Sequence, residues 1–483
     1  MKKIYRRKQQ MKNKFKLSET AFQLDGRMPL SQAIPLGLQH VLAMFVGNLT
    51  PLLIITGACG LVGGEFADLQ LSLLQNAMLI AGVVTLIQLF SIGPVGGKVP
   101  IIMGTSSGFI GVFNSVAATM GGGVLAYGAI MGASIIGGLF ETVLGFFLKP
   151  LRRFFPAVVT GTVVLSIGLS LISVGINSFG GGNNAADFGS MENLLLALFV
   201  LVVILFFKHW TKGFLSSSSI LFGIIAGYIA AIIMGLVLPR TGITADGVEY
   251  TKAWVLNWDK VKDASWFAIP QLMPVKPVFD VRAILPVLIM FIVTAVETVG
   301  DISGVMEGGL GREATDKELS GGVMCDGLGS SLAAVFGVLP NTSFSQNVGL
   351  IAMTRVVNRK AIASGAIIMV LAGLVPALGV ILASLPEAVL GGCTLMMFGS
   401  IVVSGVQMIS RCGYSQRNMS IAALSLSIGL GFTQTPQIFR IFPELLRSVF
   451  AENCVAVVFI VAVLLNLIFP KEEKEKAAAG AAE

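Results

Sequence analysis

The chain has 483 residues, of which 54% are hydrophobic and only 12% are charged, whereas soluble domains carry roughly 25% charged residues. So few charged side chains cannot cover a surface in water, but a surface that faces lipid tails does not need them, which excludes an ordinary soluble enzyme. The composition predicts a polytopic helical membrane protein, and its 57 glycines suit close helix packing or interrupted helices.

The chain begins with a strongly basic arm. Its first sixteen residues carry eight Lys and Arg side chains and no acid, within a net charge of +7. We interpret residues 1–30 as a cytosolic tail lying against the membrane, because nothing else in the sequence offers the basic groove that nucleic-acid binding needs. No cleavable signal peptide is expected, since the first apolar run begins only near Ala33 and lacks a small-residue cleavage site.

Fourteen apolar segments approach the roughly 20 residues that a membrane-spanning helix needs. The third and the tenth are the weakest, because they are short and rich in Gly, Ser, Thr and Pro. Residues of the long connection 238–281 mix both charge signs with aromatic side chains, which is typical of an interfacial segment. The predicted spans are centred near residues 45, 83, 108, 135, 166, 199, 226, 293, 328, 350, 372, 396, 425 and 459.

The distribution of basic residues tests this count independently, because short cytoplasmic loops are enriched in Lys and Arg. If the N-terminus is cytoplasmic, the loops after even-numbered spans should be basic, and they are, although Arg440 and Arg447 are exceptions on the outer side. We therefore expect fourteen spans with both termini inside. The basic residues of the even loops are Lys98, Lys149, Arg152, Arg153, Lys208, Lys212, Arg312, Lys317, Arg355, Arg359, Lys360, Arg411, Arg417, Lys471, Lys474 and Lys476.

Fourteen spans with a long central connection suggest two halves of seven, and an odd repeat unit must be inverted in its second copy. Inverted repeats are typical of transporters, whose site lies near the midplane where equivalent helices are interrupted. The weak third and tenth spans are equivalent and look alike, as residues 100–109 and 340–349 each begin with Pro and continue with polar residues. Two helix N-termini would then point at one polar ligand. The competing interpretation, close packing alone, does not explain Gln346 and Asn347.

Ionisable side chains inside spans are costly and indicate function. His40 lies in span 1 and Glu297 in its equivalent, span 8, while Asp326 lies in span 9. A carboxyl group buried in a low dielectric favours its protonated form and can exchange a proton near neutral pH, as a proton-coupled carrier requires. Glu297, Asp301 and Asp326 are the candidates, and we rank neither aspartate above the other. A buried neutral histidine remains the alternative for His40, and Glu141 is expected to reach the membrane interface.

Three motifs resemble those of one family. The segment from Gln346 to Arg355 resembles the QNxGxxxxTR signature of the nucleobase–ascorbate transporters, also called nucleobase:cation symporter family 2. Gln39 and His40, followed by Ala-Met-Phe, resemble the family's first-span motif, and the segment from Glu297 to Asp301 resembles its eighth-span motif. The resemblance is to the xanthine and uric acid permease type and extends over residues 39–355.

The resemblance implies an all-α polytopic fold of 7+7 inverted spans with short antiparallel strands in spans 3 and 10. It also implies a core domain, a gate domain, a homodimer through the gates and an elevator-like movement of the core. The implied segments are a basic cytosolic tail (1–30), core spans 1–4 (31–150), gate spans 5–7 (151–237), an outer loop (238–281), core spans 8–11 (282–385), gate spans 12–14 (386–470) and a cytosolic tail (471–483).

Carried over by position, the resemblance implies that Glu297 and Gln346 hydrogen-bond the base, and that the remaining motif residues support the site or its coupling. Ser107 falls where relatives often have an aromatic residue, so Phe109 or Phe344 is expected to supply the stacking ring. The residues so implicated are Glu297, Gln346, Ser106, Ser107, Phe109, Phe344 and Ser345 for the substrate, Asp301, Asp326, Asn347, His40 and Gln39 for coupling and support, and Gly349, Thr354 and Arg355 as signature positions.

Gln346 favours an oxopurine substrate, because its amide can pair with an N–H/C=O edge, whereas a carboxylate, which uracil carriers tend to have, only accepts. We therefore expect a bacterial inner-membrane carrier that imports xanthine or uric acid with H⁺, without a cofactor; the sequence leaves Na⁺ coupling open. The alternatives are a uracil carrier, a sulfate or dicarboxylate carrier and a passive channel. An anion carrier would more naturally place Arg or Lys at the helix mouths, and no motif indicates an enzyme.

Overall fold

The computed structural model describes residues 18–470, with gaps at 152–153, 155, 183–184, 213, 244–248, 257–266, 377–383, 444–446, 448–449 and 452. Most of the basic N-terminal tail and the whole predicted C-terminal tail lie outside the described residues. Two tryptophans of the outer connection, Trp258 and Trp266, lie outside them too.

The described chain is built almost entirely of helices, as the composition predicts. Its first half contains η1 (Glu19–Phe22), α2 (Leu30–Ala58), η2 (Gly64–Phe66), α3 (Ala67–Phe90), β1 (Met103–Thr105), α4 (Ile110–Thr119), α5 (Gly123–Phe146), α6 (Leu148–Leu151), α7 (Ala157–Phe179), α8 (Met191–Trp210), α9 (Phe214–Ser217), α10 (Ser219–Val237), β2 (Thr241–Ile243) and β3 (Glu249–Thr251).

The second half begins after the outer connection and repeats the order of long helices, strand and short helix. It contains α12 (Val281–Leu310), α13 (Asp316–Val335), β4 (Asn341–Ser343), α14 (Ser345–Thr354), α15 (Arg359–Ala372), α17 (Glu387–Arg411), α18 (Gln416–Gln434), η4 (Pro436–Phe439) and α20 (Cys454–Ile468).

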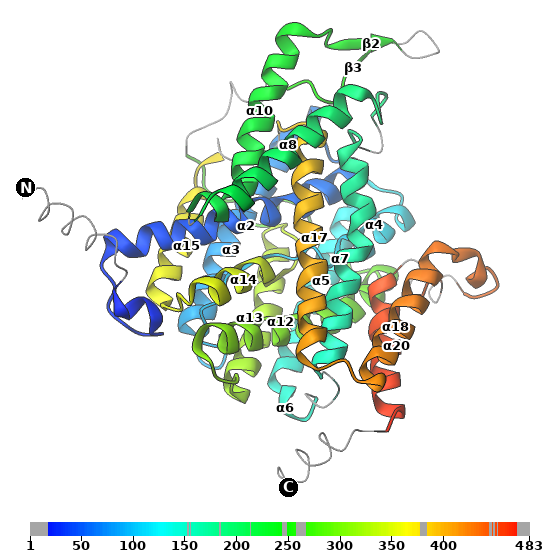
Figure 1. The fold of residues 1–483 in the computed structure, drawn as a ribbon. Coiled ribbons are helices and arrows are strands. Elements are labelled where there is room, and N and C mark those ends of the chain that lie inside the picture. Colours follow the sequence, from blue (N-terminus) through cyan, green and yellow to red (C-terminus); the bar gives the residue numbers. More distant parts are fainter. Residues whose placement is uncertain are drawn as a thin grey trace, which may run out of the picture.

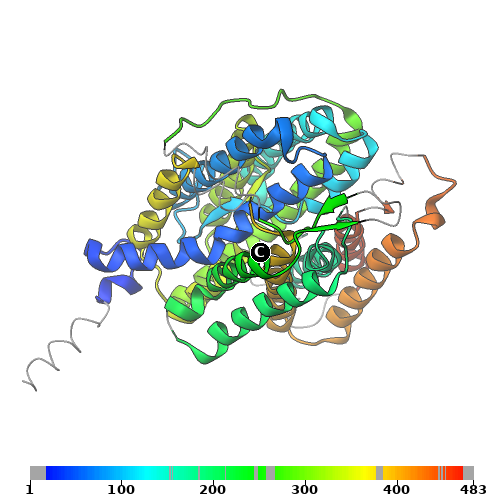
Figure 2. The ribbon, with the colours of Figure 1, turned by 90° about the horizontal axis from the view of Figure 1, so that it is seen from above.

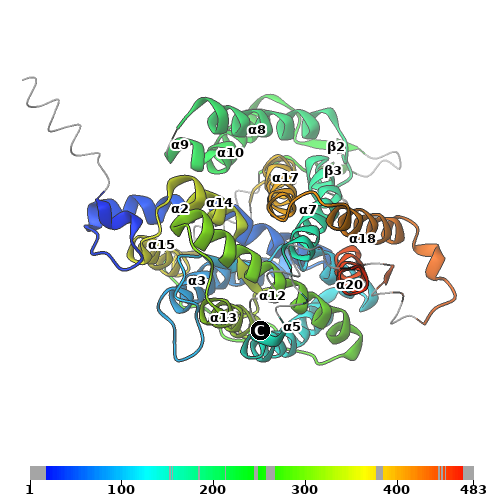
Figure 3. The same ribbon diagram turned by 60° about the horizontal axis from the view of Figure 1, so that its bottom comes forward.

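The helices pack in two groups (Figures 1 and 3). One group contains α2, α3, α5 and α12–α15 together with both strands β1 and β4. The other contains α7, α8, α10, α17, α18 and α20, with α7 and α17 side by side at its centre. Figure 2 shows the separation from above, with the green helices α8 and α10 along one edge and the light-blue and cyan helices α3 and α5 along the opposite edge.

Eight of the described helices are long and apolar enough to cross a membrane: α2, α3, α5, α7, α8, α10, α12 and α17. α4 and α20 are apolar but shorter. The polytopic helical architecture is therefore confirmed, while the count of fourteen spans stays a prediction, because the other expected spans are short or more polar helices in the described part of the chain.

Local sequence explains where the helices of the second half begin and end. The side chain of Asp280 accepts the backbone N–H of Arg282 at 2.8 Å and caps the start of α12, which ends at Gly311 with φ of +67°. A capping box between Thr315 and Glu318 then starts α13. Gly311 and the capping box of Thr315 thus fix the turn between α12 and α13, the two helices that carry Glu297, Asp301 and Asp326.

The described part of the outer connection contains regular structure. Strands β2 and β3 form an antiparallel hairpin, in which Gly242 pairs with Tyr250. Trp254, predicted to lie at the interface, is fully buried, with the ammonium of Lys252 above its ring at 5.9 Å from the centroid. Lys252 also bonds Glu192 of α8 at 2.8 Å, so the hairpin is fastened to the helices beneath it.

Candidate functional site

Two interrupted segments meet at the centre of the first helix group. In each, a proline precedes a three-residue strand, which is followed by a helix of ten residues. Strands β1 and β4 pair antiparallel, with Met103 opposite Ser343 and Thr105 opposite Asn341. Each strand is only as long as the paired segment, so the short helices α4 and α14 both begin close to the strand pair. The sequence predicts this arrangement for spans 3 and 10.

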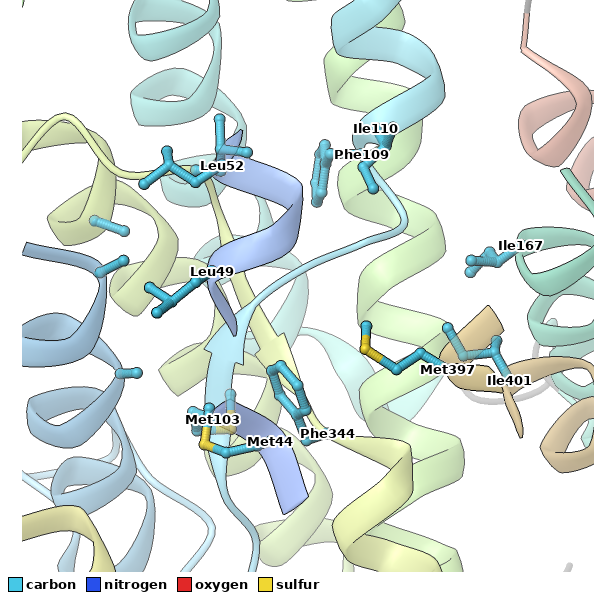
Figure 4. Packing of buried hydrophobic residues seen from close by; sticks show 14 of the residues in the cluster. Met44, Leu49, Leu52, Met103, Phe109, Ile110, Ile167, Phe344, Met397 and Ile401 are labelled. Atoms are coloured by element: carbon cyan, nitrogen blue, oxygen red, sulfur yellow. The ribbon is translucent and has the colours of Figure 1, made fainter. Parts of the chain in front are cut away.

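Glycine makes room for an aromatic ring beside this strand pair (Figure 4). A Cβ atom on Gly104 would lie 2.6 Å from Cε2 of Phe344, and one on Gly47 would lie 2.8 Å from Cε1 of the same ring. Met44 and Met103 pack nearby. The ring of Phe344 is therefore held between α2 and β1 in a slot that only glycine permits.

A small cavity of about 20 Å³ opens beside Phe344, at the N-termini of both short helices. Its polar lining comes from β1, the residues before α4, β4, α12 and the start of α14, while Ile167 of α7 and Ile401 of α17 are the contribution of the second helix group. The lining residues are Thr105, Ser107, Gly108, Ile167, Glu297, Thr342, Ser343, Phe344, Ser345, Gln346 and Ile401.

Glu297 is the acidic residue of this lining. It is 7% exposed, and its Oε2 atom has no hydrogen-bond partner in the described part of the chain. An unpaired buried carboxylate oxygen is costly unless a ligand or proton satisfies it. Among the described lining residues none is Lys or Arg, so neutral hydrogen-bond donors suit this position better than an inorganic anion does.

Asp301 lies one helical turn from Glu297 and contacts residues of the cavity lining without lining the cavity itself. Its carboxylate accepts the hydroxyl of Ser343 at 2.7 Å and that of Ser345 at 2.9 Å, and it is fully buried. Both serines line the cavity. Asp301 therefore ties α12 to the end of β4 and the first residue of α14.

Asp326 of α13 occupies an equivalent supporting position. Its Oδ2 accepts the hydroxyl of Thr298 in a short hydrogen bond and that of Thr342 at 3.4 Å, while Oδ1 has no partner in the described part of the chain. The three carboxyl groups of Glu297, Asp301 and Asp326 thus come from two neighbouring helices and meet the same strand.

Glu141 is a correction to the sequence prediction, because it does not reach the membrane interface. It is fully buried on α5, and its Oε1 accepts the hydroxyl of Thr294 at 3.2 Å. Thr294 lies one turn before Thr298 on α12. Sequence position placed Glu141 near the end of its span, whereas packing of α5 against α12 places it beside the acidic cluster.

His40 and Asn347 join the first and tenth segments. The Nδ2 atom of Asn347 lies 3.0 Å from Nδ1 of His40 and donates to the His40 carbonyl oxygen at 3.1 Å. Both side chains are buried. Gln39 beside them is 9% exposed. This pair holds α14 against α2 and leaves Gln346, its chain neighbour, at the cavity.

Two of the residues implicated in substrate binding, Phe109 and Ser106, lie outside the cavity lining. The ring of Phe109 packs between Phe113, at 5.2 Å between centroids, and Phe291, at 4.8 Å, so Phe344 is the ring at the cavity. Ser106 is fully buried, and its N–H donates to the carbonyl of Pro340 at 2.8 Å. Ser106 therefore extends the pairing of the two segments.

The signature positions after the helix start have structural places in α14. Gly349 is exposed, with open space around it. The hydroxyl of Thr354 bonds the carbonyl of Leu350 at 2.8 Å, and Arg355 closes the helix with a left-handed backbone at φ of +57°. These residues shape and end the helix: Gly349 lies less than one turn after the cavity residue Gln346, and Thr354 and Arg355 lie more than two turns after it.

Sequence reasoning missed the residues that satisfy the outer edges of the strands. Asn48 of α2 accepts the N–H of Thr105 at 2.8 Å, and Thr85 of α3 receives the N–H of Met103 at 3.0 Å. Ser330 of α13 pairs with the N–H of Asn341 at 3.0 Å. A lone Asn or Thr in an apolar span was the available signal, because an interrupted span needs side chains to satisfy its backbone.

Residues 31–438 match the model of a family described as "Permease family". Xanthine permease XanP of Escherichia coli K12 is 35% identical over 467 residues, which cover 95% of this chain and 96% of XanP. Uric acid permease PucK of Bacillus subtilis 168 is 34% identical over 448 residues, covering 92% of this chain and 97% of PucK.

The arrangement of helices is similar to that of a solved transporter. The transmembrane domain of the bicarbonate transporter BicA of a cyanobacterium matches with a TM-score of 0.51 at 15% identity, covering 91% of this chain and 97% of that domain. At this identity the likeness shows the fold alone.

Proposed function

Because this chain belongs to the Permease family, the nucleobase–ascorbate transporters, we propose that it imports oxopurines, xanthine or uric acid, together with protons. It is a multi-pass membrane transporter and not an enzyme. The cavity between the two short helices is the proposed binding site, and a co-transported H⁺ is the proposed coupling ion.

One observation carries the proposal: Glu297 and Gln346 line the same cavity beside the ring of Phe344. The carboxylate of Glu297 can accept an N–H of the base, while the Gln346 amide can accept one N–H and donate to one carbonyl oxygen. Phe344 offers a flat apolar surface for stacking. An oxopurine carries these groups along one edge and has an aromatic face.

Proton coupling follows from the position of Glu297. A carboxyl group in a buried site has to be neutralised or paired before it can cross the membrane. If Glu297 receives a proton and the base together, the loaded site crosses with less buried charge than the empty one. Asp301 and Asp326 already accept serine and threonine hydroxyls, so we assign them to supporting this exchange.

The division of the cavity lining supports an elevator-like movement. The polar groups all come from the first helix group, whereas Ile167 and Ile401 of the second group supply apolar contact. An apolar face lets the first group slide past without breaking hydrogen bonds. A volume of about 20 Å³ holds one water molecule and no base, so loading requires the two groups to separate.

We assign the first group, spans 1–4 and 8–11, as the core and the second, spans 5–7 and 12–14, as the gate through which two copies would form a homodimer. Lys98, Lys149 and Lys317, from three even-numbered loops, line one common cavity. Their common position supports a cytoplasmic face there, with both termini on the cytoplasmic side of the bacterial inner membrane.

The test is uptake of radiolabelled xanthine into cells that express Glu297→Gln, with and without a protonophore. We expect proton-driven accumulation to be abolished. Glu307→Gln is the matched control, because Glu307 lies on the same helix, α12, and is exposed. Full pH-dependent accumulation by Glu297→Gln would overturn the proposed coupling, and flux without accumulation in the unsubstituted protein would indicate a channel.

The choice of a purine over uracil rests on Gln346. Gln346→Glu replaces an amide donor by an acceptor, so it should weaken xanthine and improve uracil. An unpaired buried group costs about 1–3 kcal/mol, which corresponds to a change of about 5- to 150-fold in affinity. Competition by unlabelled xanthine, urate and uracil measures the change. Identical competition profiles for Gln346→Glu and the unsubstituted protein would remove the basis for choosing a purine over uracil.

A further inference from the structure

A basic cavity lies at the ends of α3, α5 and α13, away from the proposed substrate site. Its volume is about 630 Å³, and its lining includes Lys98 of the loop between α3 and β1, Lys149 after α5, and Lys317 in the first turn of α13. The side chain of Phe146 contributes an apolar wall and is 64% exposed. Lysines from three separate elements therefore line one space.

The acidic groups of this cavity do not cancel its charge. Its two carboxylates are Asp316 and Glu318, and Glu318 is paired with Arg312 at 2.7 Å. Counting Arg312 with the lysines, four cations stand against two carboxylates. The cavity therefore keeps an excess of positive charge that an anionic ligand would neutralise.

The loop that presents Lys98 has an unusual backbone. Lys98 adopts φ of +55°, a left-handed conformation that L side chains rarely adopt. Its N–H donates to the carbonyl oxygen of Gln88 at 3.0 Å, and the Gln88 side chain accepts the N–H of Gly97 at 3.0 Å. Strain of this kind persists where surrounding contacts fix it and often marks a binding site. Here a lysine that lines the cavity adopts a backbone conformation in which glycine is usual.

An apolar cavity of about 390 Å³ continues along the same helices. Leu139 of α5 and Leu328 and Leu332 of α13 are among its lining residues. Leu139 is 49% and Leu328 40% exposed, so the cavity opens toward the surface that faces lipid. Met324 lines the basic cavity and its chain neighbour Cys325 lines the apolar one, so the two cavities are adjacent along α13.

The length of the apolar part matches one leaflet. Its lining on α13 extends from Cys325 to Val335, which is about 15 Å at 1.5 Å per residue. The hydrocarbon core of a bilayer is about 30 Å thick, so one leaflet takes up about 15 Å. The groove thus has a basic head at the proposed cytoplasmic face and an apolar tail of one-leaflet depth.

We propose that this groove binds an anionic phospholipid, with its phosphate among Lys98, Lys149 and Lys317 and an acyl chain between α5 and α13. A soluble phosphate would use only the basic head, and a zwitterionic lipid would gain nothing from the excess positive charge. The bound lipid would connect the α3–β1 loop to α5 and α13, and so stabilise the loop that enters strand β1. This inference does not depend on which base is carried.

The experiment measures fluorescence quenching in the purified full-length protein carrying Leu328→Trp, in mixed micelles with brominated phosphatidylglycerol or phosphatidylcholine. The protein without this substitution supplies the background of the native tryptophans. We expect phosphatidylglycerol to reach half-quenching at a mole fraction at least about tenfold below that of phosphatidylcholine, since each nearby lysine contributes about fivefold. Leu139→Trp provides a second reporter if the first variant fails to fold.

Two triple variants locate the effect. Replacing Lys98, Lys149 and Lys317 by Gln should make the two lipids quench equally, while replacing Lys208, Lys212 and Lys360 by Gln should keep the preference. Equal quenching by the two lipids with all lysines present would overturn the proposal. Displacement of phosphatidylglycerol by millimolar inorganic phosphate or glycerol phosphate would also overturn it, in favour of a soluble-anion site.

Discussion

Asn48 offers a direct test of how the strand pair shapes the proposed binding site. Its Oδ1 accepts the N–H of Thr105 at 2.8 Å on the edge of β1 that faces α2, and the side chain is fully buried. Asn48→Leu keeps a similar volume but removes the acceptor, leaving a buried N–H unpaired. The cost is about 1–3 kcal/mol. The Nδ2 atom of Asn48 also donates to the carbonyl oxygen of Ala77 at 3.3 Å, so Asn48→Leu removes this second buried hydrogen bond as well.

If this cost falls on the arrangement that binds substrate, xanthine affinity should drop by about 5- to 150-fold in Asn48→Leu. Initial rates of radiolabelled xanthine uptake give the KM, and thermal melting of the purified variants separates weaker binding from general instability. The same measurements on each variant make the comparison independent of expression level.

Asn114→Leu is the matched control. Asn114 lies on α4, and its buried Oδ1 has no partner in the described part of the chain, so the substitution removes no hydrogen bond to a strand. A wild-type KM and melting temperature in Asn48→Leu would refute the reasoning. So would equal impairment of Asn48→Leu and Asn114→Leu, because the hydrogen bond from Asn48 to the strand would then be irrelevant.

Three further predictions concern the acidic cluster, the strand glycine and a helix cap. Asp301→Leu should lower the melting temperature more than Glu141→Leu, because the Asp301 substitution leaves the buried hydroxyls of Ser343 and Ser345 without an acceptor, at about 1–3 kcal/mol each. Gly104→Val should abolish xanthine uptake, since its Cβ would lie 2.6 Å from the ring of Phe344. Hydrogen bonds from the side chain and then the backbone of Arg282 lower the pKa of Asp280 from its ordinary value of 3.8. The cap it forms is therefore fully stabilising at neutral pH and is lost as the pH falls below about 4, so the melting-temperature difference between wild type and Asp280→Ala should shrink there.

A different result would contradict each of these three predictions. The hydroxyl of Thr294, the partner of Glu141, also bonds the carbonyl of Phe291 at 3.2 Å, so it keeps an acceptor in Glu141→Leu. A larger fall in melting temperature for Glu141→Leu than for Asp301→Leu would show that unpaired hydroxyls do not determine the loss. Gly111→Ala is the control for Gly104→Val, because its Cβ would meet open space. For Asp280→Ala, a melting-temperature difference that stays constant down to pH 3 would exclude a titrating cap.

Composition and local spacing were enough to predict the class of the protein and the place of its interruptions. The deficit of charge required a lipid-facing surface, and proline followed by polar residues at 100–109 and 340–349 predicted two broken spans. Glu297 and Gln346 could be selected because polar side chains inside spans are costly. These inferences needed only local composition and spacing, which every residue carries in its own neighbourhood.

Which side chains share a space became visible once the helices were packed together. Phe109 and Phe344 were equivalent candidates in sequence, but Phe109 packs with Phe113 and Phe291, and Phe344 lies at the cavity. Glu141 was expected at the interface and is buried beside Thr294. Contacts between α5 and α12, or between α2 and β1, join residues far apart in the chain. Their register depends on how complete helices pack together, and no local pattern in the sequence contains that information.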